Sequence, residues 1–182
     1  RRIPAPLLLK TNSTEARTVQ VNRAGFLYWD SRMESQMEAV VFMGLQASGK
    51  SSFYKERFFS THVRISLDLL NTRNRERQFL AACLETQQPF VIDNTNPNRE
   101  ERGKYIAAAK EAKYSVAGYY FRSKVDECLG RNQNRVESIP EVGILSTAKK
   151  LELPRIDEGF DKLYYVRLTG SGFVVEEWKD EI

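Results

Sequence analysis

The chain has 182 residues, which suits one domain of ordinary size, and its 41% hydrophobic and 29% charged content is typical of a globular protein. Its longest apolar run, residues 40–45, is far shorter than the roughly 20 residues of a membrane span. Two cysteines and one histidine exclude a Cys/His zinc site and a disulfide framework, and they argue against a Ser-His-Asp triad. This usage suggests a reducing, cytoplasmic compartment.

The formal net charge of +4 is unevenly distributed along the chain. Residues 39–150 carry 18 basic and 12 acidic side chains, whereas residues 151–182 carry 4 basic and 8 acidic ones. An excess of basic charge in the middle favours a polyanionic ligand such as a nucleotide or a nucleic acid. The plainer alternative is an ordinary solvated surface.

Residues 1–38 do not fit the pattern of the rest of the chain. Val19 and Val21 alternate with polar residues, and residues 24–29 are apolar and aromatic. We interpret residues 1–38 as a lead-in from an upstream region that packs on the domain edge. The start at Arg1, not at methionine, predicts a fragment or a trimmed chain, and nothing there is typical of a signal peptide.

From residue 39 onward, strand-like and helix-like segments alternate. Strands are predicted at residues 40–43, 63–66, 90–92, 115–121 and 163–168, with a short extra strand at 172–175. Helices are predicted at residues 50–59, 79–84 and 140–151. Two more are predicted, one that begins after an N-cap at Asn98 and one that begins at Val125. The alternation predicts an α/β domain over residues 39–182, with a parallel sheet covered by helices on both faces.

Residues 44–51, GLQASGKS, match the phosphate-binding pattern G-x-x-x-x-G-K-[ST] between a predicted strand and a predicted helix. In such a loop, backbone N–H groups and the helix N-terminus face the phosphate oxygens. Lys50 is expected to reach the β- and γ-phosphates of ATP or another nucleoside triphosphate, and Ser51 to bind Mg²⁺. The predicted nucleotide-binding residues are Gly44, Gln46, Ala47, Ser48, Gly49, Lys50, Ser51 and Ser52.

Two acidic residues follow predicted strands, where ligands of parallel sheets bind. Asp93 ends the strand at 90–92 and is expected to hold the metal directly or through water; the alternative is an Asx turn with Asn94. Asp68 follows the strand at 63–66 and is a candidate general base for an acceptor hydroxyl; the alternative is a helix N-cap.

Basic side chains form two clusters in the sequence. Arg131 and Arg135 are four residues apart, so we expect them on one helix face that closes over the donor phosphates. Arg73, with Arg75 and Arg77, is expected on the acceptor side together with Asn94. The alternative is a solvated helix end for Arg131 and Arg135, and a solvated helix start for the cluster at Arg73.

Together these motifs resemble the P-loop kinase domain of polynucleotide 5′-hydroxyl kinases, as found in polynucleotide kinase-phosphatases. The resemblance covers roughly residues 39–168 and rests on the loop at 44–53, VIDNTNP at 91–97, RNQNR at 131–135, and Pro154 with residues 158–160. It implies a P-loop kinase fold with a central parallel sheet of about five strands and a helical lid.

By this resemblance, Asp68 is the general base that activates the 5′-OH, and Arg131 and Arg135 are lid arginines. Lys50 binds phosphates. Several members of the family carry an arginine three residues after the base, where this chain has Asn71. Arg73, two residues further on, is the candidate to replace that arginine. The candidate nucleic-acid contacts are Asp68, Arg73 and Asn94.

The leading hypothesis is transfer of the γ-phosphate of a nucleoside triphosphate to the 5′-OH of RNA or DNA in nucleic-acid end repair. No Asp-x-Asp-x-Thr phosphatase signature occurs in this chain, so we expect a kinase that is alone here or fused to an upstream partner. An end-processing phosphatase or ligase, fused or separate, is the partner expected. Three alternatives stay open: a P-loop kinase of a small metabolite or nucleoside, a nucleotide-hydrolysing ATPase or switch, and a P-loop fold that has lost activity.

Overall fold

The computed structural model describes residues 19–21, 27–29, 37–136 and 138–179. The chain divides into two units, residues 1–36 and 37–182. In the first unit, β1 (Val19–Val21) pairs antiparallel with β2 (Leu27–Trp29). The predicted packing of residues 1–38 on a domain edge falls largely on residues outside those described.

The second unit is built on a six-stranded sheet of order β4-β5-β3-β6-β7-β8. Its strands are β3 (Glu38–Met43), β4 (Val63–Ile65), β5 (Phe90–Ile92), β6 (Ser115–Phe121), β7 (Lys162–Thr169) and β8 (Gly172–Glu177). The first five are parallel, as predicted, and the short extra strand forms an antiparallel hairpin with β7. β3 is apolar throughout residues 39–43 because helices cover both faces of the sheet's centre.

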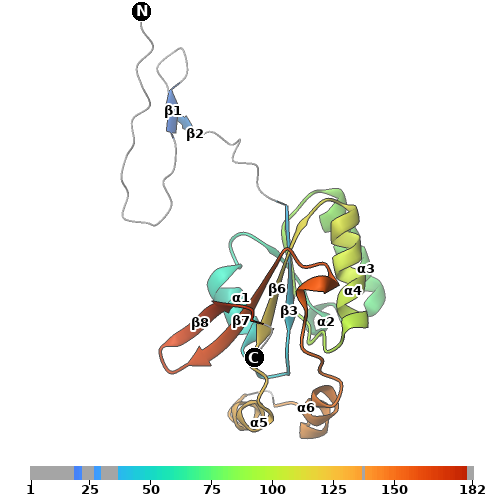
Figure 1. The fold of residues 1–182 in the computed structure, drawn as a ribbon, viewed down its shortest axis with the longest axis vertical. Coiled ribbons are helices and arrows are strands. Elements are labelled where there is room, and N and C mark those ends of the chain that lie inside the picture. Colours follow the sequence, from blue (N-terminus) through green and yellow to red (C-terminus); the bar gives the residue numbers. More distant parts are fainter. Residues whose placement is uncertain (1–18, 22–26, 30–36, 137, 180–182) are drawn as a thin grey trace, which may run out of the picture. The chain divides into compact units, whose positions relative to one another are not determined.

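Helices cover the two faces of the sheet (Figure 1). One face packs against α3 (Arg73–Glu85) and α4 (Arg99–Glu111), and the other against α1 (Lys50–Arg57). α5 (Val125–Gln133) and α6 (Glu141–Ala148) lie together beyond one end of the sheet. The short α2 (Leu67–Leu70) follows β4, and a single 3₁₀ turn occupies Ile156–Glu158.

Local signals explain most of these boundaries. The Asn98 side chain accepts a hydrogen bond from the Glu101 N–H at 2.9 Å, which confirms the predicted N-cap of α4. The polar stretch before Phe79 is helical in the structure, which agrees with the alternative of a helix start at Arg73. Two helices occupy it, and the Thr72 side chain caps α3 by accepting from the Arg75 N–H.

Candidate active site

The phosphate-binding loop joins the end of β3 to the start of α1, as the sequence predicts. Gly44 and Gly49 have φ values of 136° and 102°, in the region that favours glycine. A Cβ at Gly44 would lie 2.9 Å from the Phe121 carbonyl oxygen, so β6 leaves no room for a side chain there. The loop is therefore fixed both by its backbone conformation and by the neighbouring strand.

Lys50 is folded into the loop that precedes it. Its ammonium group donates to the carbonyl oxygens of Gly44 at 2.9 Å and Leu45 at 2.5 Å, and to the Ser48 hydroxyl at 3.3 Å. Burial lowers the pKa of Lys50 to about 8, although the negative charges of Asp93 and Asp68 act in the opposite direction. A buried ammonium at the start of a helix is suited to phosphate oxygens.

The two predicted metal ligands lie next to each other. The Ser51 hydroxyl donates to the Asp93 carboxylate at 2.9 Å, and Asp93 is buried at the end of β5. Mg²⁺ prefers oxygen ligands and is usually held by one or two carboxylates together with substrate phosphates. A hydroxyl and a buried carboxylate beside the phosphate loop fit that preference, and the carboxylate contacts Ser51 across the sheet end.

Arg64 was not predicted as a site residue, yet it contacts both of these groups. Its guanidinium approaches Asp93 Oδ2 at 2.6 Å from Nη2 and 2.8 Å from Nε, and Nη2 also donates to the Ser51 hydroxyl at 2.9 Å. Arg64 comes from β4, which pairs with β5. The sequence signal for Arg64 was a basic residue inside a predicted strand, shortly before Asp68.

Asp68 lies on α2, directly beyond the end of β4. The residue at the N-cap of this helix is Ser66, so the alternative in which Asp68 is the cap does not hold. Asp68 is exposed, and its charge is near enough to act on the pKa of Lys50. An exposed carboxylate beside the phosphate loop is available to an acceptor hydroxyl.

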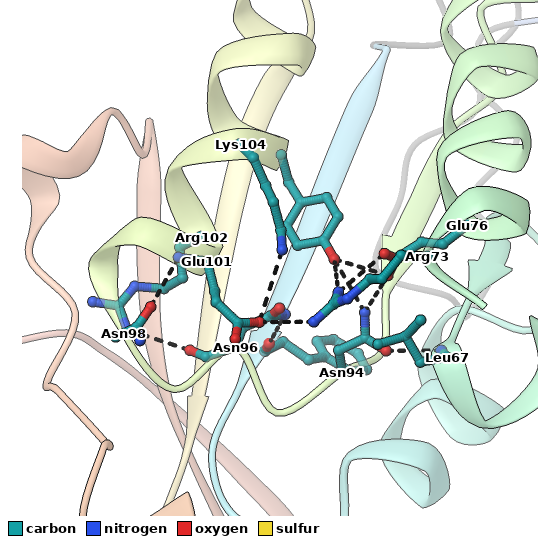
Figure 2. Close-up of polar contacts among 11 residues, drawn as sticks. Leu67, Arg73, Glu76, Asn94, Asn96, Asn98, Glu101, Arg102 and Lys104 are labelled. Atoms are coloured by element: carbon teal, nitrogen blue, oxygen red, sulfur yellow. Dashed lines mark hydrogen bonds and ion pairs between the residues drawn. The ribbon is translucent and has the colours of Figure 1, made fainter. Parts of the chain in front are cut away.

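The two candidate acceptor contacts, Arg73 and Asn94, are engaged within the protein (Figure 2). Arg73 donates to Glu76 at 3.0 Å and to Glu101 at 3.1 Å, so its charge is largely balanced by two carboxylates. Asn94 accepts from the Leu67 N–H at 2.9 Å and donates to Glu76 at 2.6 Å.

The lid arginines lie near the loop but not on one helix face. Arg131 donates to the Ala47 carbonyl at 2.8 Å, which places it on the phosphate loop. α5 ends at Gln133, so Arg135 follows the helix, exposed, and the predicted shared face is wrong. Near this helix end, the Asn132 side chain donates to the Ile139 carbonyl at 2.8 Å and accepts from the Ile139 N–H at 3.0 Å.

The remaining loop residues differ in their surroundings. Gln46 donates to the Thr147 hydroxyl at 3.0 Å and thus joins the loop to α6. Ser52 is exposed on α1.

Among residues 37–136 and 138–179, no group of three or more His, Cys, Asp or Glu side chains could hold a metal ion. No helix in the described part of the chain is long and apolar enough to cross a membrane.

Comparisons with known proteins relate the chain, and not its individual site residues, to other proteins. A family model described as an AAA domain matches residues 67–154. The chain is 28% identical over 147 residues to the bifunctional polynucleotide phosphatase/kinase of Schizosaccharomyces pombe, covering 76% of this chain and 35% of that protein. It is 30% identical over 154 residues to a putative bifunctional polynucleotide phosphatase/kinase of Acanthamoeba polyphaga mimivirus, covering 78% and 36%. The chain thus spans about a third of the length of these relatives.

Solved structures share the fold at lower identity. A gluconokinase from Sinorhizobium meliloti matches with a TM-score of 0.54 and 21% identity, over 72% of this chain and 83% of that one. A chain of the Pnkp1/Rnl/Hen1 RNA repair complex matches with a TM-score of 0.53 and 18% identity, over 63% and 43%. The chain has the P-loop kinase fold, and the comparisons confirm its resemblance to bifunctional polynucleotide phosphatase/kinases.

Proposed function

We propose that this chain is a polynucleotide 5′-hydroxyl kinase that transfers the γ-phosphate of a nucleoside triphosphate to the 5′-OH of RNA or DNA. The observation that carries the proposal is the exposed carboxylate of Asp68, held beside a complete phosphate-binding loop in a chain that resembles polynucleotide phosphatase/kinases. A nucleotide hydrolase needs no such carboxylate at the end of β4.

In the proposed reaction Asp68 takes the proton of the attacking hydroxyl. The 5′ oxygen forms a bond to the γ-phosphorus, and the bond from that phosphorus to the bridging oxygen of the diphosphate breaks. Lys50, Arg131 and Arg135 neutralise charge on the transferred group and on the leaving diphosphate. Ser51 and Asp93 would hold Mg²⁺, which would supply further neutralisation of the phosphate oxygens.

The relatives also suggest a setting for the reaction. Because both are named bifunctional phosphatase/kinases, we propose that this kinase works beside an end-processing phosphatase or ligase in nucleic-acid repair. We propose a reducing, cytoplasmic setting from the low cysteine usage.

One observation favours a second candidate, a kinase of a small metabolite or nucleoside. Arg73, the acceptor-side arginine, is paired with Glu76 and Glu101, which weakens its attraction for a nucleic-acid phosphate. A small acceptor needs no such contact, since Asp68 alone meets the hydroxyl.

The test is transfer of labelled γ-phosphate, with Mg²⁺, to an oligonucleotide that carries a 5′-OH. We expect label on the 5′-OH strand, none on a 5′-phosphorylated strand of the same sequence, and loss of transfer in Asp68→Ala with nucleotide binding retained. If nucleoside or sugar acceptors are labelled and the oligonucleotide is not, the second candidate is correct. Hydrolysis that persists unchanged in Asp68→Ala, with no acceptor labelled, contradicts both.

A further inference from the structure

Asn94 uses its whole side-chain amide inside the protein. Its oxygen accepts from the Leu67 N–H at 2.9 Å, and its nitrogen donates to Glu76 Oε1 at 2.6 Å and to the Tyr105 hydroxyl at 3.3 Å. The side chain thus bridges the end of β5 to α2, α3 and α4, as Figure 2 shows for Leu67 and Glu76. Both amide hydrogens and one of the two acceptor sites on the oxygen are therefore used within the protein, which leaves little for a substrate.

The bond from Asn94 to Leu67 fixes the helix that carries Asp68. Leu67 is the first residue of α2, and the side chain of its N-cap residue, Ser66, makes no capping hydrogen bond. The first N–H groups of a helix need partners from outside the helix. Asn94 provides one of them from a segment 27 residues away in sequence, and Asp68 is the next residue along α2.

Glu76 and Tyr105 fix Asn94 in turn. The Glu76 side chain is 5% exposed, and it accepts from Asn94, from the Tyr105 hydroxyl at 2.8 Å and from Arg73 at 3.0 Å. Burial raises the pKa of Tyr105, and the Glu76 carboxylate adds to the rise, so the phenol stays protonated and donates. These three donors hold the carboxylate in place, because releasing any one of them removes a hydrogen bond from a buried charged group.

We propose that Asn94, Glu76 and Tyr105 are positioning residues for the transfer reaction: they hold α2 so that the Asp68 carboxylate faces the acceptor hydroxyl. This inference rests on the proposed function, in which Asp68 is the base. It assigns Asn94 to the support of the base and not to the substrate. The network acts through a four-residue helix, whose own hydrogen bonds are too few to set its direction.

The kinetic test is a double-mutant cycle between Asn94→Ala and Asp68→Ala. We expect Asn94→Ala to lower kcat for transfer about tenfold to a hundredfold, with the affinity for ADP changed less than about twofold. In the Asp68→Ala background the same change should have no further effect, because Asn94 acts only through Asp68. Equal effects of Asn94→Ala in both backgrounds would overturn the proposal.

A second pair of variants tests the chemistry of the network. Asn94→Asp keeps an oxygen for the Leu67 N–H but places a carboxylate against Glu76, so transfer should fall. Adding Glu76→Gln removes that repulsion and supplies a donor, and the double variant should be more active than Asn94→Asp alone. A double variant no more active than Asn94→Asp contradicts the assigned contact.

The matched control is Asn98→Ala, which removes another asparagine that caps a helix, here α4. It should lower the urea concentration at the midpoint of unfolding with no change in kcat. Amide hydrogen exchange gives a measurement that needs no acceptor: residues 67–71 should exchange faster in Asn94→Ala and not in Asn98→Ala. If wild-type protein labels no oligonucleotide, the proposed function fails, and the exchange of residues 67–71 still decides whether Asn94 holds α2. Unchanged exchange there refutes the inference.

Discussion

Replacing Arg64 with methionine tests the ion pair at the predicted metal site. Arg64 makes two contacts with Asp93 Oδ2, at 2.6 and 2.8 Å, and one with the Ser51 hydroxyl at 2.9 Å. The Asp93 side chain is 1% exposed and that of Arg64 is 20% exposed. Methionine keeps most of the unbranched apolar stem of arginine and removes only its charge and its donors.

The expected loss in the free energy of unfolding depends on the hydrogen bond that Asp93 still accepts in the variant. Breaking a buried ion pair by removing one partner typically destabilises a protein by about 3–5 kcal/mol. Here the Ser51 hydroxyl still donates to Asp93, and water already reaches one side of the guanidinium. We therefore expect Arg64→Met to lower the free energy of unfolding by about 2–3 kcal/mol, below the range for a fully buried pair.

Urea unfolding followed by far-UV circular dichroism measures this difference directly. The control is Arg64→Met combined with Asp93→Asn, which removes the unpaired charge and should recover all but about 1 kcal/mol of the loss. The reasoning is refuted if Arg64→Met is as stable as the wild type, or if the double variant is less stable than Arg64→Met alone.

Three further predictions concern the loop, the lid and the core. The pKa of Lys50 is about 8 in the folded protein against an ordinary 10.5, so the unfolded chain binds more protons between these values. The free energy of unfolding should therefore rise as the pH is raised through that window, and Lys50→Met should abolish the rise in urea titrations at several pH values. Arg131→Ala should weaken ADP binding several-fold in calorimetry, and an unchanged affinity would remove Arg131 from the site. A Cβ at Gly118 would lie 2.6 Å from Leu163 and 2.8 Å from Phe160, so Gly118→Ala should reduce stability by about 1–3 kcal/mol. Unchanged stability in urea unfolding would mean that both side chains move freely to make room.

The phosphate loop was predictable because its geometry is local. Residues 44–51 are contiguous, and the backbone conformation that glycine allows at Gly44 and Gly49 shapes the loop. The positions of Asp68 and Asp93 followed from a rule of topology, since parallel strands bring their carboxyl ends to one edge of a sheet. These two kinds of signal need no knowledge of which strands are neighbours.

Arg64 could not be assigned in the same way. Its partner Asp93 lies 29 residues away, and the two meet only because β4 lies beside β5 at the edge of the sheet. The start of α3 likewise carries no periodic signal in the sequence. Its first residues are polar and mostly exposed, so they lack apolar periodicity, and the helix is held there by the Thr72 cap and by the buried Glu76.

Arg73 shows why residue type alone does not separate a ligand contact from a structural one. An arginine near the acceptor side has the right chemistry for a phosphate, and in the sequence nothing distinguishes it from a free cation. In the structure Glu76 is buried within 3.0 Å of it, and a buried carboxylate without a cation is costly. Arg73 therefore neutralises the Glu76 carboxylate, and a substrate phosphate would have to compete with that carboxylate for Arg73. Because Glu76 also holds Asn94, the same competition would loosen the contact that supports α2 and Asp68.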